Sequence, residues 1–192
     1  MSEESYMIRR PTAEETARLT VLSGCSGGGK SSLLKELARR GHAVRPEPGR
    51  QIVREQTLID GPGLPWKDLS CFVDLCLSRA THFHATAVAE ARRTIFDRSV
   101  VDAVAALERA GLAVAGHHRR IVERLRYART VFLVPPWQEL FEQDGERQHD
   151  FGVAVAEYEH LLTAYPAAGY DVEIVPKGPL AERADFIEAR LA

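Results

Sequence analysis

Hydrophobic and polar residues follow two alternating patterns along this chain. Short apolar runs typical of buried strands occur at residues 19–23, within 41–47, and at 94–97, 130–134 and 171–175. Segments with the periodicity of amphipathic helices lie between and after them, at 32–40, 49–56, 68–93, 100–110, 117–128 and 180–191. A further helical segment follows residue 150 and ends at about residue 165. Strands that alternate with helices predict an α/β fold, with helices covering both faces of a five-stranded parallel sheet.

A glycine-rich loop joins the first strand to the first of these helices. It reads Gly24-Cys25-Ser26-Gly27-Gly28-Gly29-Lys30-Ser31-Ser32 and fits the pattern G-x-x-x-x-G-K-[ST]. Such glycines let backbone N–H groups surround phosphates, and the helix N-terminus adds a partial positive charge. We therefore expect a nucleoside triphosphate site, with Lys30 at the β- and γ-phosphates and the Ser31 hydroxyl on Mg²⁺. The alternative, a turn that carries a lysine by chance, is disfavoured by the complete motif between a strand and a helix.

Length and composition limit the remaining possibilities. The chain has 192 residues, 45% of them hydrophobic, and a net charge of -2. These values predict one phosphate-loop domain over 18–192 after a polar N-terminal arm at 1–17, with no strong attraction to nucleic acid or anionic membranes. The sequence shows neither a membrane-spanning stretch nor a basic-then-apolar leader, so we expect a cytoplasmic protein. Three cysteines without C-x-x-C spacing argue against a disulfide framework or a zinc site.

Polar residues at the carboxyl ends of strands are candidates for chemistry, because ligands of such sheets bind there. Asp97 could bind Mg²⁺ opposite Ser31, with Arg98 facing the transferring phosphoryl group. The alternative for Asp97 is a helix cap. Glu47 follows the second strand and could accept a proton from an attacking hydroxyl, or be a solvated turn residue; the residues alone leave both open.

Two basic segments allow further interpretations. Arg147 lies in a polar segment, 138–150, that could close over the nucleotide as a lid, and its guanidinium could then neutralise charge in the transition state as an arginine finger in cis. The alternative is a surface ion pair. The stretch from Arg119 to Arg129 could bind nucleic acid, but a solvated helix face is favoured because the net charge is low and aromatic residues do not alternate with the arginines.

With these residues placed, the chain resembles P-loop kinases of the nucleoside-kinase branch. More closely, it resembles a bacterial family of small AAA-type predicted ATPases that is similar to the ribosylnicotinamide kinase domain. The resemblance covers residues 19 to about 187. It rests on the phosphate loop, Pro46-Glu47, Leu64-Pro65-Trp66, Asp97-Arg98-Ser99 with Asp102, residues 131–137, Gln143-Asp144 with Glu146-Arg147, and Val175-Pro176.

This resemblance implies a three-layer α/β/α sandwich and specific roles for several residues. It implies that Glu47 is a catalytic base, that Arg147 belongs to a lid, and that Pro176 lies beside the nucleotide base. We expect the acceptor pocket near Arg50, Trp66, Arg79 and Asp102.

The sequence favours a kinase that uses Mg²⁺ and ATP to phosphorylate a hydroxyl of a small, nucleoside-like acceptor. One alternative is a slow ATPase or GTPase that acts as a regulatory switch. Another is a kinase for nucleic-acid ends, sugars or antibiotics. The identity of the acceptor, the preference for ATP over GTP and the oligomeric state stay open at this stage.

Overall fold

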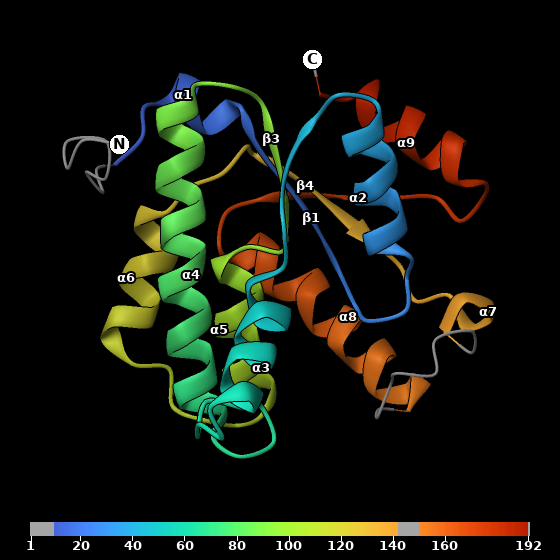
Figure 1. Ribbon diagram of the computed structural model, residues 1–192. Coiled ribbons are helices and arrows are strands. Elements are labelled where there is room, and N and C mark those ends of the chain that lie inside the picture. Colours follow the sequence, from blue (N-terminus) through green and yellow to red (C-terminus); the bar gives the residue numbers. More distant parts are fainter. Residues whose placement is uncertain (1–9, 142–149, 192) are drawn as a thin grey trace.

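A five-stranded parallel sheet forms the centre of the molecule. The computed structural model describes residues 10–141 and 150–191. The sheet has the order β2 (Ala43–Arg45), β3 (Thr94–Asp97), β1 (Leu19–Gly24), β4 (Thr130–Val134), β5 (Asp171–Ile174) (Figure 1). Because the strand order reverses around β1, a crevice opens beyond the carboxyl ends of β1 and its neighbours. The phosphate loop leaves β1 at that point.

Helices cover both faces of the sheet, as expected. They are α1 (Ala13–Ala17), α2 (Lys30–Arg39), α3 (Pro48–Leu58), α4 (Leu69–Glu90), α5 (Val100–Arg109), α6 (Gly116–Arg124), α7 (Gln138–Phe141), α8 (Phe151–Ala167) and α9 (Leu180–Glu188). Leu22 of β1 packs in a core with residues of α2 and α9, whereas the adjacent Val21 packs with residues of α4, α5 and α8. Successive residues of a strand point to opposite faces, so the two cores confirm the three-layer sandwich.

The observed element boundaries agree closely with the periodicity, with one clear correction. The helix predicted at 117–128 ends at Arg124, and the buried residues Leu125 and Tyr127 lie in the connection to β4. Asp68 begins α4 by accepting a hydrogen bond from the Cys71 N–H at 2.9 Å. None of the helices in the described part of the chain is long and apolar enough to cross a bilayer.

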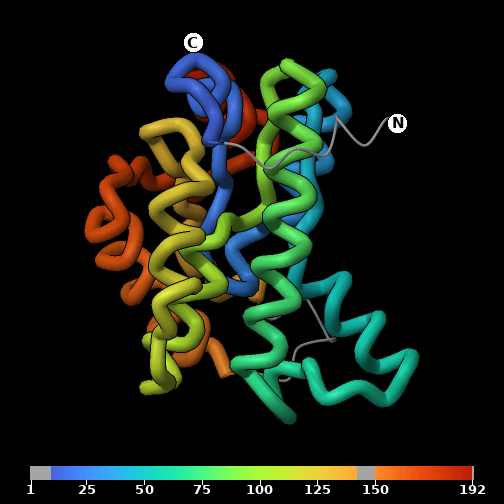
Figure 2. Tube along the Cα trace, turned by 90° about the vertical axis from the view of Figure 1, so that its left-hand side faces the viewer, coloured from blue at the N-terminus to red at the C-terminus, as the bar shows by residue number. Residues whose placement is uncertain are grey.

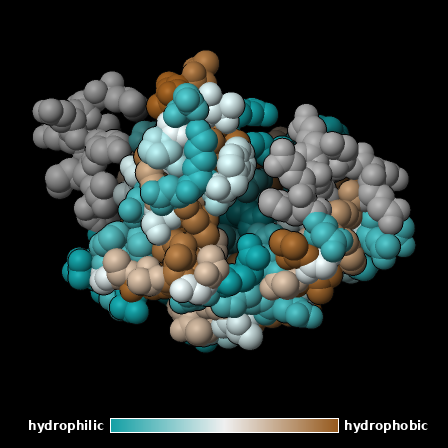
Figure 3. Space-filling model, turned by 90° about the horizontal axis from the view of Figure 1, so that it is seen from below, coloured by the Kyte–Doolittle hydropathy of each residue, from teal (hydrophilic) through white to brown (hydrophobic). Residues whose placement is uncertain are grey.

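The carboxyl edge of the sheet is where the structure opens. α3 and the loop after it project from the body at this end of the molecule (Figure 2). Seen from this edge, the surface is hollowed near its middle, and hydrophilic residues line the hollow (Figure 3).

Candidate active site

The phosphate loop needs its glycines because the end of β4 packs against it. Gly24 has a φ of +125°, and a Cβ there would lie 2.3 Å from the Val134 carbonyl oxygen. A Cβ on Gly28 would lie 2.6 Å from Val134 Cγ1 and 2.8 Å from the Pro135 carbonyl oxygen. All three distances are shorter than a Cβ contact allows. The glycine at position 28 therefore has a steric reason beyond the constrained positions of the motif.

Lys30 lies folded onto the loop that precedes it. Its Nζ donates hydrogen bonds to the carbonyl oxygens of Gly24 at 2.9 Å and Cys25 at 2.8 Å. Burial, with a contribution from the nearby Arg98, lowers the pKa of Lys30. Burial also raises the pKa of the Cys25 thiol, although the Lys30 charge opposes this. The ammonium is thus positioned at the loop and would exchange its carbonyl partners for phosphate oxygens.

Asp97 presents a buried carboxylate oxygen with no hydrogen-bond partner. Its residue is 7% exposed, and Oδ1 is the oxygen without a partner. Burial is the main cause that raises the pKa of Asp97 to about 6, and the neighbouring Glu47 adds to it. Asp97 and the exposed Ser31 line the same cavity. An unpaired carboxylate oxygen beside a hydroxyl is a donor set that suits Mg²⁺, so these residues fit the metal that the motif implies.

Arg98 joins three carboxylates at the edge of this cavity. Its Nε lies 3.1 Å from Glu47 Oε1, and its Nη1 lies 2.8 Å from Glu157 Oε1 and 3.4 Å from Asp102 Oδ1. Its backbone is left-handed, with a φ of +70°. Burial opposes the charge, but the carboxylates outweigh it and raise the pKa of Arg98 well above its usual value. The guanidinium is therefore a fixed cation beside the phosphate loop.

Sequence reasoning missed Glu157, which lies on α8. Its Oε2 accepts a hydrogen bond from the Ser26 N–H of the phosphate loop at 3.4 Å. Burial opposes its ionisation, but Arg98 and Lys30 outweigh that effect and lower the pKa of Glu157. The one available signal was its position three residues after Ala154, at the edge of the apolar stripe of its helix.

Asp102 lies behind the site and does not line the cavity, contrary to the expectation of an acceptor contact. It accepts hydrogen bonds from the Ser23 and Tyr165 hydroxyls, and from the Ser99 N–H at 2.7 Å. Ser99 and Asp102 form the capping box that begins α5. Asp102 therefore links β1, α5 and α8 below Arg98.

The structure brings some of the predicted acceptor residues together and separates others. A cavity of about 290 Å³ is lined by Ser31, Leu34, Lys35, Ala38, Val44, Pro46, Glu47, Arg50, Gln51, Arg54 and Asp97. Trp66 is 62% exposed and does not line this cavity. Arg79 lies behind it, where it donates to Gln51 at 2.7 Å and pairs with Glu55 at 2.9 Å. Arg147 falls outside the described residues.

A second missed residue, Arg183 of α9, contacts the outer side of the phosphate loop. Its Nη2 donates to the Gly28 carbonyl oxygen at 2.9 Å, and the residue is 3% exposed. Burial lowers the pKa of Arg183, and no carboxylate of the described residues pairs with it. Pro176, expected beside the nucleotide base, is exposed in the segment between β5 and α9.

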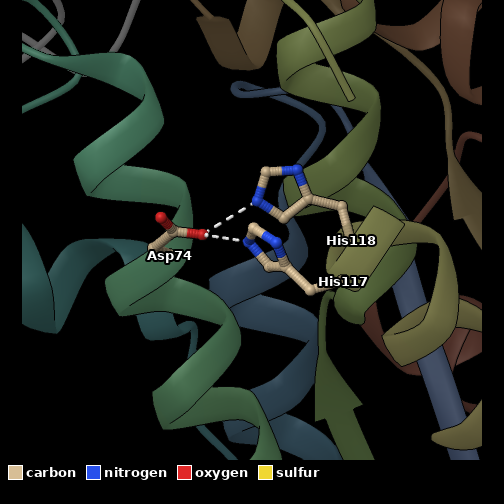
Figure 4. Close-up of side chains that lie close together, drawn as sticks. All are labelled: Asp74, His117 and His118. Atoms are coloured by element: carbon tan, nitrogen blue, oxygen red, sulfur yellow. Dashed lines mark hydrogen bonds and ion pairs between the residues drawn. The ribbon is translucent and has the colours of Figure 1, made fainter. Parts of the chain in front are cut away.

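A cluster away from this cavity, made of Asp74, His117 and His118, links α4 to α6 (Figure 4). The Nε2 atoms of His117 and His118 lie 3.2 Å and 2.8 Å from Asp74 Oδ1. His118 Nδ1 accepts from the Ala115 N–H at 3.2 Å, so the ring proton of a neutral His118 is on Nε2. A protonated Nε2 donates to Asp74 and has no lone pair for a metal, so this cluster is a hydrogen-bonded link.

The profile of an AAA-domain family matches residues 19–183. The chain belongs to this family. The matched region runs from the start of β1 to Arg183, so it contains the phosphate loop, the cavity and Glu157. No curated protein matches the chain.

Solved structures similar to this AAA-domain protein include two kinases. The NadR protein in complex with NR has a TM-score of 0.70 at 12% identity; the match covers 92% of this chain and 51% of that one. Thymidylate kinase from Ehrlichia chaffeensis has a TM-score of 0.60 at 14% identity, covering 90% and 97% of the two chains. Deoxyadenosine kinase from M. mycoides has a TM-score of 0.62 at 14% identity, covering 90% and 98%.

The chain therefore spans about half of the NadR chain and nearly all of the two kinases. At these identities the likeness shows a shared fold. It confirms the P-loop kinase-like sandwich expected from the sequence.

Proposed function

We propose that the protein is a kinase that transfers the γ-phosphoryl group of ATP to an oxygen of a small, nucleoside-like acceptor. The observation that carries the proposal is the position of Glu47. This carboxylate is held by Arg98 and lines the same cavity as Ser31 and Asp97, beside the phosphate loop. A carboxylate at this position can orient an attacking hydroxyl or a water, and the cavity of about 290 Å³ that it lines leaves room for an acceptor larger than water.

The chemistry assigns one task to each residue. An acceptor hydroxyl attacks the γ-phosphorus, the bond from that phosphorus to the β,γ-bridging oxygen breaks, and ADP leaves. The proton of the hydroxyl passes to the Glu47 carboxylate. Lys30 and Arg98 stabilise the negative charge on the phosphoryl oxygens, and the cavity orients the acceptor for in-line attack.

Ser31 and Asp97 would hold Mg²⁺, which neutralises charge on the β- and γ-phosphates when it is bound. Asp97 must be ionised for this role. Pro176 and Arg183 lie on the β5–α9 side of the loop, which we assign to the nucleotide base and ribose. We assign the opposite side, next to β2, to the acceptor, because Glu47 lines the cavity there.

Mass spectrometry of reactions with Mg²⁺-ATP and pooled nucleosides, nucleotides, ribosylnicotinamide and sugars tests this proposal. We expect an acceptor that gains one phosphoryl group with the wild-type protein and not with Lys30→Ala. ADP and free phosphate formed at the same rate with and without every acceptor would overturn the kinase assignment and support a hydrolytic switch.

A further inference from the structure

The cavity beside the phosphate loop carries an excess of positive side chains. Lys35 of α2 and Arg50 and Arg54 of α3 all line it. Lys35 and Arg54 form no ion pair with a carboxylate in the described part of the chain. The nearest carboxylate oxygen to Arg50 is Glu47 Oε2, with 3.9 Å between it and Arg50 Nε.

The two carboxylates of the cavity do not neutralise this charge. Glu47 already pairs with Arg98 at 3.1 Å, and Asp97 is the residue that would hold Mg²⁺. The acidic residue of α3, Glu55, faces α4 and pairs with Arg79 at 2.9 Å. Helix α3 therefore directs Glu55 away from the cavity and Arg50 and Arg54 toward it.

The spacing of the two arginines adds to the case for an anionic ligand. Arg50 and Arg54 are four residues apart on one helix, where like charges repel each other. An anion between them and Lys35 would relieve this repulsion. Guanidinium groups form paired hydrogen bonds with both carboxylates and phosphates, and three cations suit the double negative charge of a phosphate monoester better than the single charge of a carboxylate.

We propose that the acceptor itself carries a phosphate monoester, which Lys35, Arg50 and Arg54 bind. This inference rests on the proposed kinase function and specifies its substrate class. It places neutral nucleosides, and ribosylnicotinamide with its positively charged ring, among the poor acceptors. Their 5′-monophosphates and sugar phosphates are the candidates.

The reacting oxygen belongs either to that phosphate or to a hydroxyl elsewhere in the acceptor. In both cases a new bond to the γ-phosphorus forms and ADP leaves. A hydroxyl gives its proton to Glu47, whereas an ionised phosphate oxygen has no proton to give. Phosphorus NMR of the product distinguishes the two, because one yields a phosphoanhydride and the other a second phosphate ester.

Matched acceptor pairs test the proposal: a nucleoside and its 5′-monophosphate, ribosylnicotinamide and its mononucleotide, and ribose and ribose 5-phosphate. We expect the phosphorylated member to react with at least a tenfold higher kcat/KM. Arg50→Gln and Arg54→Gln should each raise its KM about tenfold and change kcat little. Arg109→Gln, which removes an exposed charge outside the cavity, should change neither value.

Calorimetry separates failure of this inference from failure of the kinase assignment. The titration adds each monophosphate to the protein saturated with Mg²⁺ and a non-hydrolysable ATP analogue. Binding that Arg50→Gln and Arg54→Gln each weaken about tenfold, without turnover, would support the phosphate site and overturn the kinase. Turnover of a neutral nucleoside with a KM that neither substitution changes would support the kinase and overturn the phosphate site. If no monophosphate binds, the inference is wrong whatever the turnover.

Discussion

Arg98 and Glu157 form an ion pair of 2.8 Å across 59 residues of sequence. The pair joins the strand end that carries Asp97 to helix α8, and Glu157 also accepts from the Ser26 N–H. Arg98 in turn holds Glu47. The phosphate loop and the acceptor-side carboxylate are thus connected through one guanidinium.

Replacing Glu157 tests this connection. In Glu157→Gln, Arg98 loses a charged partner, and Glu47 then pairs with a guanidinium that is no longer held in place. We therefore expect kcat to fall on the order of 10²-fold, with a smaller change in nucleotide affinity. Glu157→Asp should restore part of the rate because it keeps the charge. Steady-state kinetics and nucleotide titration measure both effects. Glu159→Gln, an exposed change on the same helix, is the control. Equal losses in kcat and in folding stability for Gln and Asp would instead indicate a purely structural residue.

Lys30 should matter for binding and not for folding. Its ammonium is buried against two carbonyl oxygens, and burial lowers its pKa. We expect Lys30→Met to leave the free energy of unfolding unchanged or higher, because a buried charge is removed. The same change should abolish ATP binding in a fluorescence titration. ATP affinity close to that of the wild type would contradict the assignment of this loop.

Asp97→Asn should have opposite effects on stability and on activity. The pKa of Asp97 rises from 3.8 to about 6 in the folded chain, so its contribution to stability is full below about pH 4 and is lost as the pH rises through 6. At pH 8 the ionised carboxylate therefore lowers the free energy of unfolding by up to about 3 kcal/mol. We expect Asp97→Asn to stabilise the nucleotide-free protein at pH 8, in urea unfolding, and to remove Mg²⁺-dependent transfer.

The same pKa predicts that Mg²⁺-nucleotide binding weakens below about pH 6, because protonated Asp97 cannot bind a cation. Isothermal titrations at pH 5 and pH 8 measure this difference. An affinity that does not change between these pH values, or a loss of stability in Asp97→Asn at pH 8, would contradict the role given to this residue.

Gly28→Ala tests the fit between the phosphate loop and β4. The added Cβ would lie 2.6 Å from Val134 Cγ1 and 2.8 Å from a backbone oxygen. We therefore expect the free energy of unfolding to fall by about 1–3 kcal/mol and ATP binding to weaken. Gly152→Ala is the matched control, because its Cβ would lie 3.6 Å from the nearest atom, an Asp150 carboxylate oxygen. Thermal unfolding compares the two. If Gly28→Ala unfolds at the wild-type temperature, the loop can move away from β4 with little loss of stability, which would contradict the tight fit.

The local features of the fold were predictable because local patterns determine them. The apolar runs at 94–97 and 130–134 coincide with β3 and β4, and the loop motif identified the turn after β1. Asp97 was also accessible to sequence reasoning, because the carboxyl ends of parallel strands meet at one edge.

The long-range contacts of the site were not predictable. Whether Glu157 meets Arg98 depends on how α8 packs on the sheet, and nothing local to residue 157 reveals its partner. Asp102 was expected to line the acceptor pocket, yet its carboxylate accepts hydrogen bonds from the N-cap of α5 and from the Tyr165 hydroxyl. The acceptor pocket was expected near Trp66 and Arg79, but Trp66 is exposed in the loop between α3 and α4, and Arg79 pairs with Glu55. These outcomes depend on tertiary packing, which a single sequence does not encode at recognisable spacings.

The most direct test of the kinase assignment follows the γ-phosphoryl group itself. Mg²⁺-ATP labelled in that group is incubated with wild-type protein and with Glu47→Gln, with and without the acceptor pool. A kinase transfers the label to an organic acceptor, and Glu47→Gln slows a hydroxyl acceptor about 10²–10⁴-fold while ATP binding persists. Label that appears only in inorganic phosphate, at a rate that acceptors and Glu47→Gln leave unchanged, would contradict it.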